Sequence, residues 1–239
     1  MTPDSSIRER PAALSGDNGL AARLRGFGPV GILSIFAILL AGNMGAGSVG
    51  ALPTGGLLVL AWARLSRTPW RALGYVSPKN WIATLGCGIA FGIVFKILMK
   101  MLIMPLLGAP PVNPAYHYLA GNRAMLPGAV WTMLIAGFGE ETVFRGYLFE
   151  RGARLFGRRA AASAATVLLT SALFAAVHYA DQGLMGVEQA AITGLVFGMI
   201  FAGTGSIFFL MFAHAAFDLT AVAIIYWDVE SKLAHFVFR

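Results

Sequence analysis

The long uncharged stretches of the sequence limit what the chain can fold into. No Asp, Glu, Lys or Arg occurs between Arg25 and Arg64, and further apolar blocks follow along the chain. Each block is close to the roughly 20 residues that a helix needs to cross a bilayer. Only 12% of the 239 residues are charged, against about 25% in ordinary globular domains. So few charges cannot cover a soluble domain, and we expect an all-α, polytopic transmembrane helical bundle.

Breaks between the apolar blocks predict about seven spans, with six to eight compatible with the sequence. The breaks are basic clusters, a Pro-rich stretch from Gly108 to Tyr116 that cannot be helical, and a GTGS segment at 203–206. The expected spans are 28–44, 48–63 (which could be re-entrant), 81–107, 127–150, 160–179, 185–203 and 206–227. We divide the chain into a polar N-terminal tail at 1–26, disordered or lying on the surface, a transmembrane helical domain at 27–227 and a short C-terminal tail at 228–239.

Basic residues are shared unevenly between the two sides of this arrangement. With a cytoplasmic N-terminus, twelve of them face the cytoplasm, in the tail at 1–26 and in loops at 64–79 and 151–159. Only Arg123, Lys232 and Arg239 then face the other side. Cytoplasmic loops carry the excess of Lys and Arg in membrane proteins, which favours this orientation. We expect an integral protein of a bacterial-type cytoplasmic membrane. The partners are then the lipid bilayer and a substrate, and no basic–aromatic stripe indicates a nucleic acid.

Several ionisable residues lie inside the expected spans, where they are costly and usually face a cavity or one another. Glu141 and Arg145 are four residues apart in the fourth span, the favourable spacing and order for an intrahelical ion pair. Glu140 points about 100° away around the helix, so it has no partner there and could serve as a general base. The alternative is that both glutamates are structural.

Histidines in two other spans join these carboxyl groups. His214 and Asp218 are four residues apart in the seventh span, so the carboxyl group can fix the tautomer of the imidazole. Phe174 precedes His178 by one turn in the fifth span and should pack beside it. A lone histidine is often only a packing residue, but two histidines and three carboxyl groups on three spans indicate a site.

Three motifs now stand in order: Glu140-Glu141-x-x-x-Arg145, Phe174-x-x-x-His178 and His214-x-x-x-Asp218. They resemble the signature motifs of the type II CAAX prenyl endopeptidase and bacteriocin-processing (CPBP) family of intramembrane proteases. The resemblance covers about residues 70–225. It implies an all-α endopeptidase that hydrolyses a peptide bond near the cytosolic face. In prenyl-processing members the substrate is a C-terminal tripeptide that follows a lipidated cysteine, so a peptide or lipidated peptide is the expected substrate.

The resemblance also implies roles for the site residues. Glu140 and His178 would activate a water, while His214 and the residue at 218 would hold the oxyanion. Eukaryotic-type members have Asn where this chain has Asp218, and an ionised Asp only accepts hydrogen bonds. Asp218 is therefore either protonated, or it orients His214. We favour metal-free chemistry and assign no cofactor. Zinc remains possible, because Glu140, His178, His214 and Asp218 could form a two-nitrogen, two-oxygen shell.

Other functions fit parts of the sequence. A catalytically idle membrane immunity or scaffold protein is the main alternative, although it need not keep both histidines and Glu140. A proton-coupled transporter could use buried Glu and His, but repeated halves are absent from the sequence. Counting residues along the spans also places Glu140, His178 and His214 at depths that do not converge.

Two lysines, Lys96 and Lys100, lie one turn apart in the third span. We expect them to snorkel toward an interface. The alternative is that they receive a substrate carboxylate.

Overall fold

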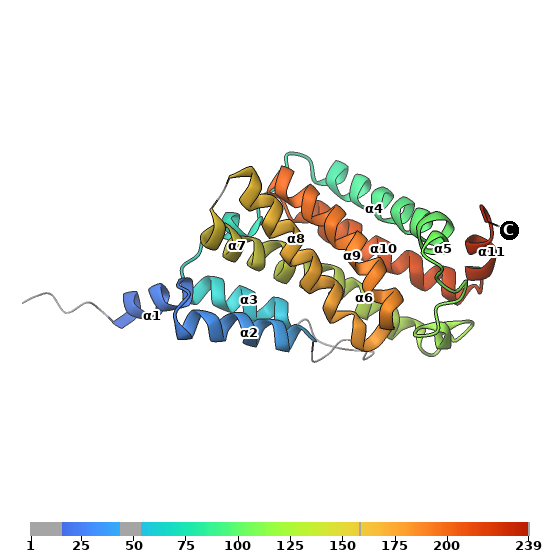
Figure 1. Cartoon of the computed structure of the whole chain (residues 1–239), viewed down its shortest axis with the longest axis horizontal. Helices are drawn as coiled ribbons and strands as arrows, with labels where there is room; N and C mark the ends of the chain where they lie inside the picture. Colours follow the sequence, from blue (N-terminus) through green and yellow to red (C-terminus); the bar gives the residue numbers. More distant parts are fainter. Residues whose placement is uncertain (1–15, 44–53, 158, 239) are drawn as a thin grey trace, which may run out of the picture.

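The computed structural model describes residues 16–43, 54–157 and 159–238 (Figure 1). Every regular element in these ranges is a helix, so the predicted all-α class is confirmed. The α-helices are α1 (Gly16–Arg25), α2 (Pro29–Asn43), α3 (Thr54–Leu65), α4 (Trp81–Leu98), α5 (Met104–Leu106), α6 (Leu126–Glu141), α7 (Leu148–Phe156), α8 (Ala160–Val177), α9 (Tyr179–Thr204), α10 (Phe208–Tyr226) and α11 (Glu230–Ala234). Two π-helical segments, η2 (Met99–Ile103) and η4 (Thr142–Tyr147), and two 3₁₀ turns, η1 (Trp70–Leu73) and η3 (His117–Leu119), join them.

Four helical stretches of the described residues are long and apolar enough to cross a membrane. They are Trp81–Leu106, Ala160–Val177, Tyr179–Thr204 and Phe208–Tyr226. A fifth is possible if Gly19–Arg25 and Pro29–Gly42, which meet at 60°, form one broken span. α3 is apolar but short, at 12 residues. The expected span at 48–63 therefore has its helix at α3, while residues 44–53 lie outside the described part.

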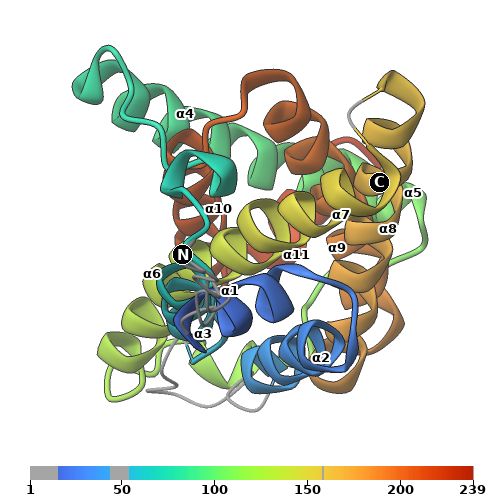
Figure 2. The same ribbon diagram turned by 90° about the vertical axis from the view of Figure 1, so that its left-hand side faces the viewer.

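The helices run along the longest axis of the molecule, and successive segments alternate in direction (Figure 1). α10 packs against α4 and α6, α8 packs against α9, and α2 packs against α3. Figure 2 shows α4 along one side of the molecule and the α2–α3 pair along the opposite side. α1 and α7 lie at one end of the long axis, while α5 and α11 lie at the other. The two ends of the bundle are therefore built from different helices.

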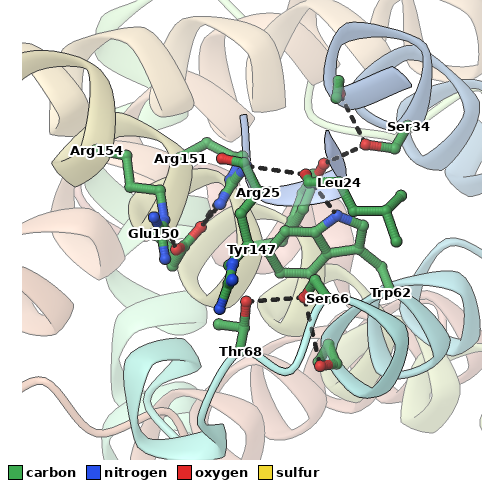
Figure 3. A network of polar contacts seen from close by, with 12 residues as sticks. Leu24, Arg25, Ser34, Trp62, Ser66, Thr68, Tyr147, Glu150, Arg151 and Arg154 are labelled. Atoms are coloured by element: carbon green, nitrogen blue, oxygen red, sulfur yellow. Dashed lines mark hydrogen bonds and ion pairs between the residues drawn. The ribbon is translucent and has the colours of Figure 1, made fainter. Parts of the chain in front are cut away.

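The run α6–η4–α7 is helical without a break from Leu126 to Phe156. We expected a basic loop at 151–159, and this is wrong for Arg151 and Arg154, which lie on α7. Glu150 gives both arginines an ion-pair partner within the helix, so the charges do not need a loop to reach water. Arg151 also donates to the carbonyl oxygens of Leu24 and Arg25 at the end of α1 (Figure 3).

Two other boundaries depart from expectation for local reasons. α9 begins at Tyr179 rather than 185, with a break at Gly183, whose φ of 62° lies in the left-handed region that glycine adopts without strain. α1 lies inside the stretch predicted as a polar tail, where residues 1–15 are outside the described part. At the other end Glu230 is buried, so the C-terminal segment packs into the bundle.

Candidate active site

The site begins with a close approach of two helices. A Cβ placed on Gly137 of α6 would lie only 2.6 Å from the backbone nitrogen of Ala215 on α10. Any larger residue at 137 would force the helices apart, so glycine allows their backbones to meet here. The carboxyl groups one turn further along α6 are thereby brought against His214 of α10.

Glu141 lies at the centre of this contact and is fully buried. Its Oε1 accepts from Arg145 Nη1 at 2.8 Å, so the predicted ion pair is present. The same oxygen lies 2.7 Å from Nδ1 of His214. Because a carboxylate only accepts, Nδ1 is the donor. One of the two roles expected for Asp218 was to orient His214, whereas Nδ1 of His214 donates its hydrogen bond to Glu141.

The other ring nitrogen of His214 faces two further carboxyl groups. Nε2 lies 3.9 Å from Glu140 Oε2 and 3.5 Å from Asp218 Oδ2. The Glu140 side chain is 35% exposed and that of Asp218 is 21% exposed, in contrast to the closed environment of Glu141. Glu141 thus holds the back of the imidazole, while Glu140 and Asp218 lie at its front.

Phe174 connects the two histidines. Its ring centroid lies 4.6 Å from that of His178 and 6.0 Å from that of His214. The packing of Phe174 beside His178 is therefore confirmed. The Arg145 guanidinium lies over the same ring, 4.5 Å from its centroid. His178 Nδ1 lies 2.6 Å from the carbonyl oxygen of Phe174 and must donate to it, which leaves Nε2 as the acceptor in a neutral ring.

A cavity of about 240 Å³ borders these groups. Its lining includes Glu140, Phe174, His178, His214 and Asp218, and Oε2 of Glu140 has no hydrogen-bond partner among the described residues. The residues that line the cavity do not include Glu141 or Arg145. The four predicted catalytic residues therefore share one cavity, and the predicted ion pair supports them from behind.

The remaining wall of the cavity comes from the end of the bundle that carries α5 and α11. It includes residues 109–119, the far ends of α2 and α3, and Glu230. Lys96 and Lys100 line it as well, so the expectation that they snorkel is wrong. Lys96 donates to Gln189 and Lys100 to the buried Glu230, so both have partners inside the protein.

The zinc alternative requires at least three ligands around one point. Within residues 16–43, 54–157 and 159–238, no group of three or more His, Cys, Asp and Glu side chains could hold a metal ion. Nδ1 of both His178 and His214 is engaged by protein oxygens, which leaves each Nε2 free and does not by itself argue against a metal. The donor set as arranged does not fit a zinc shell, and no step below uses one.

Comparison with known proteins addresses the motifs directly. Residues 122–220 match the family model described as type II CAAX prenyl endopeptidase Rce1-like, a stretch that contains all three motifs. This segment, about two fifths of the chain, is similar to the Rce1-like family. The resemblance drawn from the motifs is confirmed, and the Rce1-like family is one of proteases. No curated protein and no solved structure matches the chain.

The motifs identified the candidate site residues of this Rce1-like segment, but the sequence did not predict that they lie at the same depth in the membrane. Counting along separate helices predicts no common level, yet His214 lies within 4 Å of both Glu140 and Asp218. The role of Glu141 toward His214 was also missed. One signal was available in Gly137, which is one turn before Glu141 and permits a close helix contact.

Proposed function

We propose that the protein is an intramembrane endopeptidase that hydrolyses a peptide bond with a water activated by Glu140 and His178. One observation carries the proposal. Glu140, His178, His214 and Asp218 come from α6, α8 and α10 and line a single cavity. Glu140 is partly exposed there and has an unpartnered oxygen.

The reaction follows from the free atoms. Glu140 takes a proton from the water. At the same time the oxygen of the water forms a bond to the scissile carbonyl carbon. The tetrahedral intermediate then collapses, the C–N bond breaks, and the leaving amine receives that proton. His178 assists through Nε2, which can accept a proton or a hydrogen bond from the water while Nδ1 is held by the Phe174 carbonyl. General acid–base catalysis of this kind contributes about 10²–10⁴-fold.

The developing oxyanion needs hydrogen-bond donors. His214 can supply one from Nε2 when the ring carries a second proton, since Glu141 occupies Nδ1 and compensates the charge. Asp218 can supply another when it is protonated, 3.5 Å from the same nitrogen. Arg145 fixes Glu141 and therefore acts as a positioning residue.

The substrate that fits best is a prenylated or other membrane-associated peptide cleaved near its C-terminus. The cavity wall mixes these polar groups with apolar side chains such as Met104, Val177 and Ile224. Such a lining can hold an extended peptide beside a lipid chain or an apolar side chain. The enzyme is an integral membrane protein, which we place in a bacterial-type cytoplasmic membrane.

We further propose seven spans with a cytoplasmic N-terminus, formed by α2, α3, α4–α5, α6–α7, α8, α9 and α10. Their alternating directions support this count. The basic residues of α1, of 64–79 and of α7 gather at one end, since Arg151 and Trp62 both bond to the carbonyl of Leu24. The positive-inside rule then makes that end cytoplasmic.

This orientation conflicts with one expectation from the resemblance. The cavity is lined by the far ends of α2 and α3, which lie about 20 Å along the helices from the basic end. A cytoplasmic basic end and hydrolysis near the cytosolic face are therefore incompatible in this structure. We give priority to the charge asymmetry, so the cavity faces the extracytoplasmic side.

Cysteine labelling decides the orientation. Cys87 is the sole cysteine of the chain, so Cys87→Ser provides a clean background. On intact bacterial cells, an impermeant maleimide should label Tyr118→Cys, at the cavity end. It should label Lys79→Cys, at the basic end, only after permeabilisation. The reverse pattern would show that the cavity faces the cytoplasm.

Catalysis is tested with purified protein and a library of prenylated and unprenylated peptides. Cleavage should occur, and Glu140→Gln should abolish it while leaving expression and thermal unfolding unchanged, because the amide keeps the shape but cannot take the proton. Near-normal turnover by Glu140→Gln would refute the assigned base. Binding of peptides without any cleavage by the unmodified protein would instead favour an idle membrane partner.

A further inference from the structure

Lys96 is a buried cation in the cavity wall whose two direct contacts, Gln189 and the Phe217 ring, are neutral. Its side chain is 8% exposed, and Nζ donates to Gln189 Oε1 at 2.9 Å. The ammonium also lies over the Phe217 ring, 4.7 Å from the centroid. No carboxylate lies within ion-pair distance of Nζ in the part of the chain that the structure describes. Burying an ammonium away from an opposite charge is costly, so its place in a cavity wall calls for an explanation.

Two glycines on the same helix face determine the position of Lys96. Gly88, Gly92 and Lys96 are four residues apart on α4 and so share one face. A Cβ on Gly92 would lie 2.1 Å from the carbonyl oxygen of Ala213, so the α4 and α10 backbones are in direct contact. One turn further along α4, this contact places Lys96 against Phe217, the neighbour of Asp218. The ammonium is therefore held next to the reactive end of the cavity.

The neighbouring lysine provides a contrast. Lys100 lies one turn after Lys96 and also lines the cavity, but its Nζ lies 3.0 Å from Oε1 of the buried Glu230. That carboxylate also accepts from the backbone nitrogen of Asn113. Lys100 is thus paired with the carboxylate that joins α11 to the loop before α6, while Lys96 has no such carboxylate and remains available to an anion.

We propose that Lys96, held by Gln189, binds the C-terminal carboxylate of the peptide substrate. An ammonium has three donors, and Gln189 takes one of them. A carboxylate is the acidic group that every peptide with a free C-terminus carries, and a charge-assisted hydrogen bond to it is strong in a site of low dielectric constant. The inference rests on the proposed function for its substrate class, and it explains why cleavage occurs near a C-terminus.

A structural role for Lys96 makes a different prediction. Lys96 is within electrostatic range of Asp218 and could serve only to balance that carboxyl group. In that case its removal would alter the protein equally toward all peptides. A carboxylate-binding role instead makes the effect depend on the chemistry of the peptide terminus.

The experiment compares a fluorescent farnesylated peptide with a free C-terminal carboxylate and the same peptide ending in an amide. Binding is measured by fluorescence anisotropy on the full chain in detergent micelles, in a Glu140→Gln background so that turnover does not interfere. The acid should bind about ten- to hundred-fold more tightly than the amide. Lys96→Met should reduce this ratio to about one, and Lys96→Gln provides a second variant should Lys96→Met fold poorly.

Lys100→Met is the matched control, an identical substitution one turn away, and it should keep the acid preference. Equal binding of acid and amide, absence of binding by either, or an unchanged ratio in both Lys96 variants overturns the proposal. The proposal is also overturned if the acid preference disappears when phosphatidylglycerol is added, since the site would then hold a lipid phosphate. Because binding needs no turnover, a Lys96-dependent acid preference without cleavage by the unmodified protein would refute the protease and leave the carboxylate site intact.

Discussion

Two charge clusters are built around the helical run α6–η4–α7 and differ in how completely their atoms are paired. The anchor cluster consists of Glu150, Arg151 and Arg154 (Figure 3). Both oxygens of Glu150 accept from arginine, and Arg151 uses its remaining nitrogen on backbone carbonyls. The site cluster consists of Glu140, Glu141, Arg145, His214 and Asp218. There Glu140 Oε2, Glu141 Oε2 and Arg145 Nη2 have no hydrogen-bond partner among the described residues.

This difference in pairing indicates that the anchor cluster has a structural role and the site cluster a functional one. A fully paired cluster gains nothing from a ligand, and the anchor cluster contributes by joining α1 to α7. Unpaired buried atoms cost stability and are retained only where another group uses them. In the site cluster, Glu140 lines the cavity, while Glu141 and Arg145 lie behind it at the π-helical segment η4, a distortion often found at functional sites.

The largest effect is expected from breaking the pair behind the cavity. Glu141→Ala leaves Arg145 as a buried charge without its ion-pair partner, and Arg145→Ala leaves Glu141 with only the hydrogen bond from His214. Breaking a buried pair costs roughly 3–5 kcal/mol. Both variants should unfold at lower temperature in detergent and lose activity, because Glu141→Ala removes the acceptor at His214 Nδ1 and Arg145→Ala removes the group that fixes this acceptor. Unchanged midpoints for both would refute the structural role of the pair.

Asp218 tests the front of the cluster, where activity rather than stability should change. Asp218→Ala should lose about 10²–10³-fold in turnover, the usual effect of removing one oxyanion donor. Asp218→Asn should retain substantial activity, since the amide still offers a donor at nearly the same size. Turnover of the two variants is measured side by side with bound metal. Equal loss in both, together with loss of metal, would contradict the donor role.

The anchor cluster should respond in the opposite way. Arg151→Met removes the link to α1 but leaves Glu150 paired with Arg154, so we expect a loss of about 1–3 kcal/mol in unfolding free energy. Turnover per folded molecule should stay unchanged, because none of these residues lines the cavity. A fall in turnover at full occupancy of the folded state would remove the distinction between the two clusters.

The sequence predicted features that depend on neighbouring residues along the chain, and it missed those that depend on contacts between helices. Apolar blocks predicted the helices, and the spacing of Glu141 and Arg145 predicted their pair, since both patterns are local. The bond from Glu141 to His214 joins residues 73 apart and requires the α6–α10 contact at Gly137. Charge alone also misplaced Arg151 in a loop and Lys96 at an interface, because Arg151 is paired with Glu150 and with carbonyls of α1, and Lys96 with Gln189 of α9.

The smallest effect is expected from removing metal ions. Zinc would need three or four donor atoms about 2.0–2.2 Å from one point. Nδ1 of His214 is bonded to Glu141 and Nδ1 of His178 to a backbone carbonyl, so each ring has only Nε2 to offer. The Nε2 of His214 faces Glu140 and Asp218 at 3.9 and 3.5 Å, and within the described residues no group of three such side chains could hold a metal ion. Turnover should therefore survive exhaustive chelation with both a strong chelator and a zinc-selective one. If chelation removes activity and zinc alone restores it, the cluster rearranges around a metal, and Glu140 and Asp218 act as ligands rather than as base and oxyanion donor.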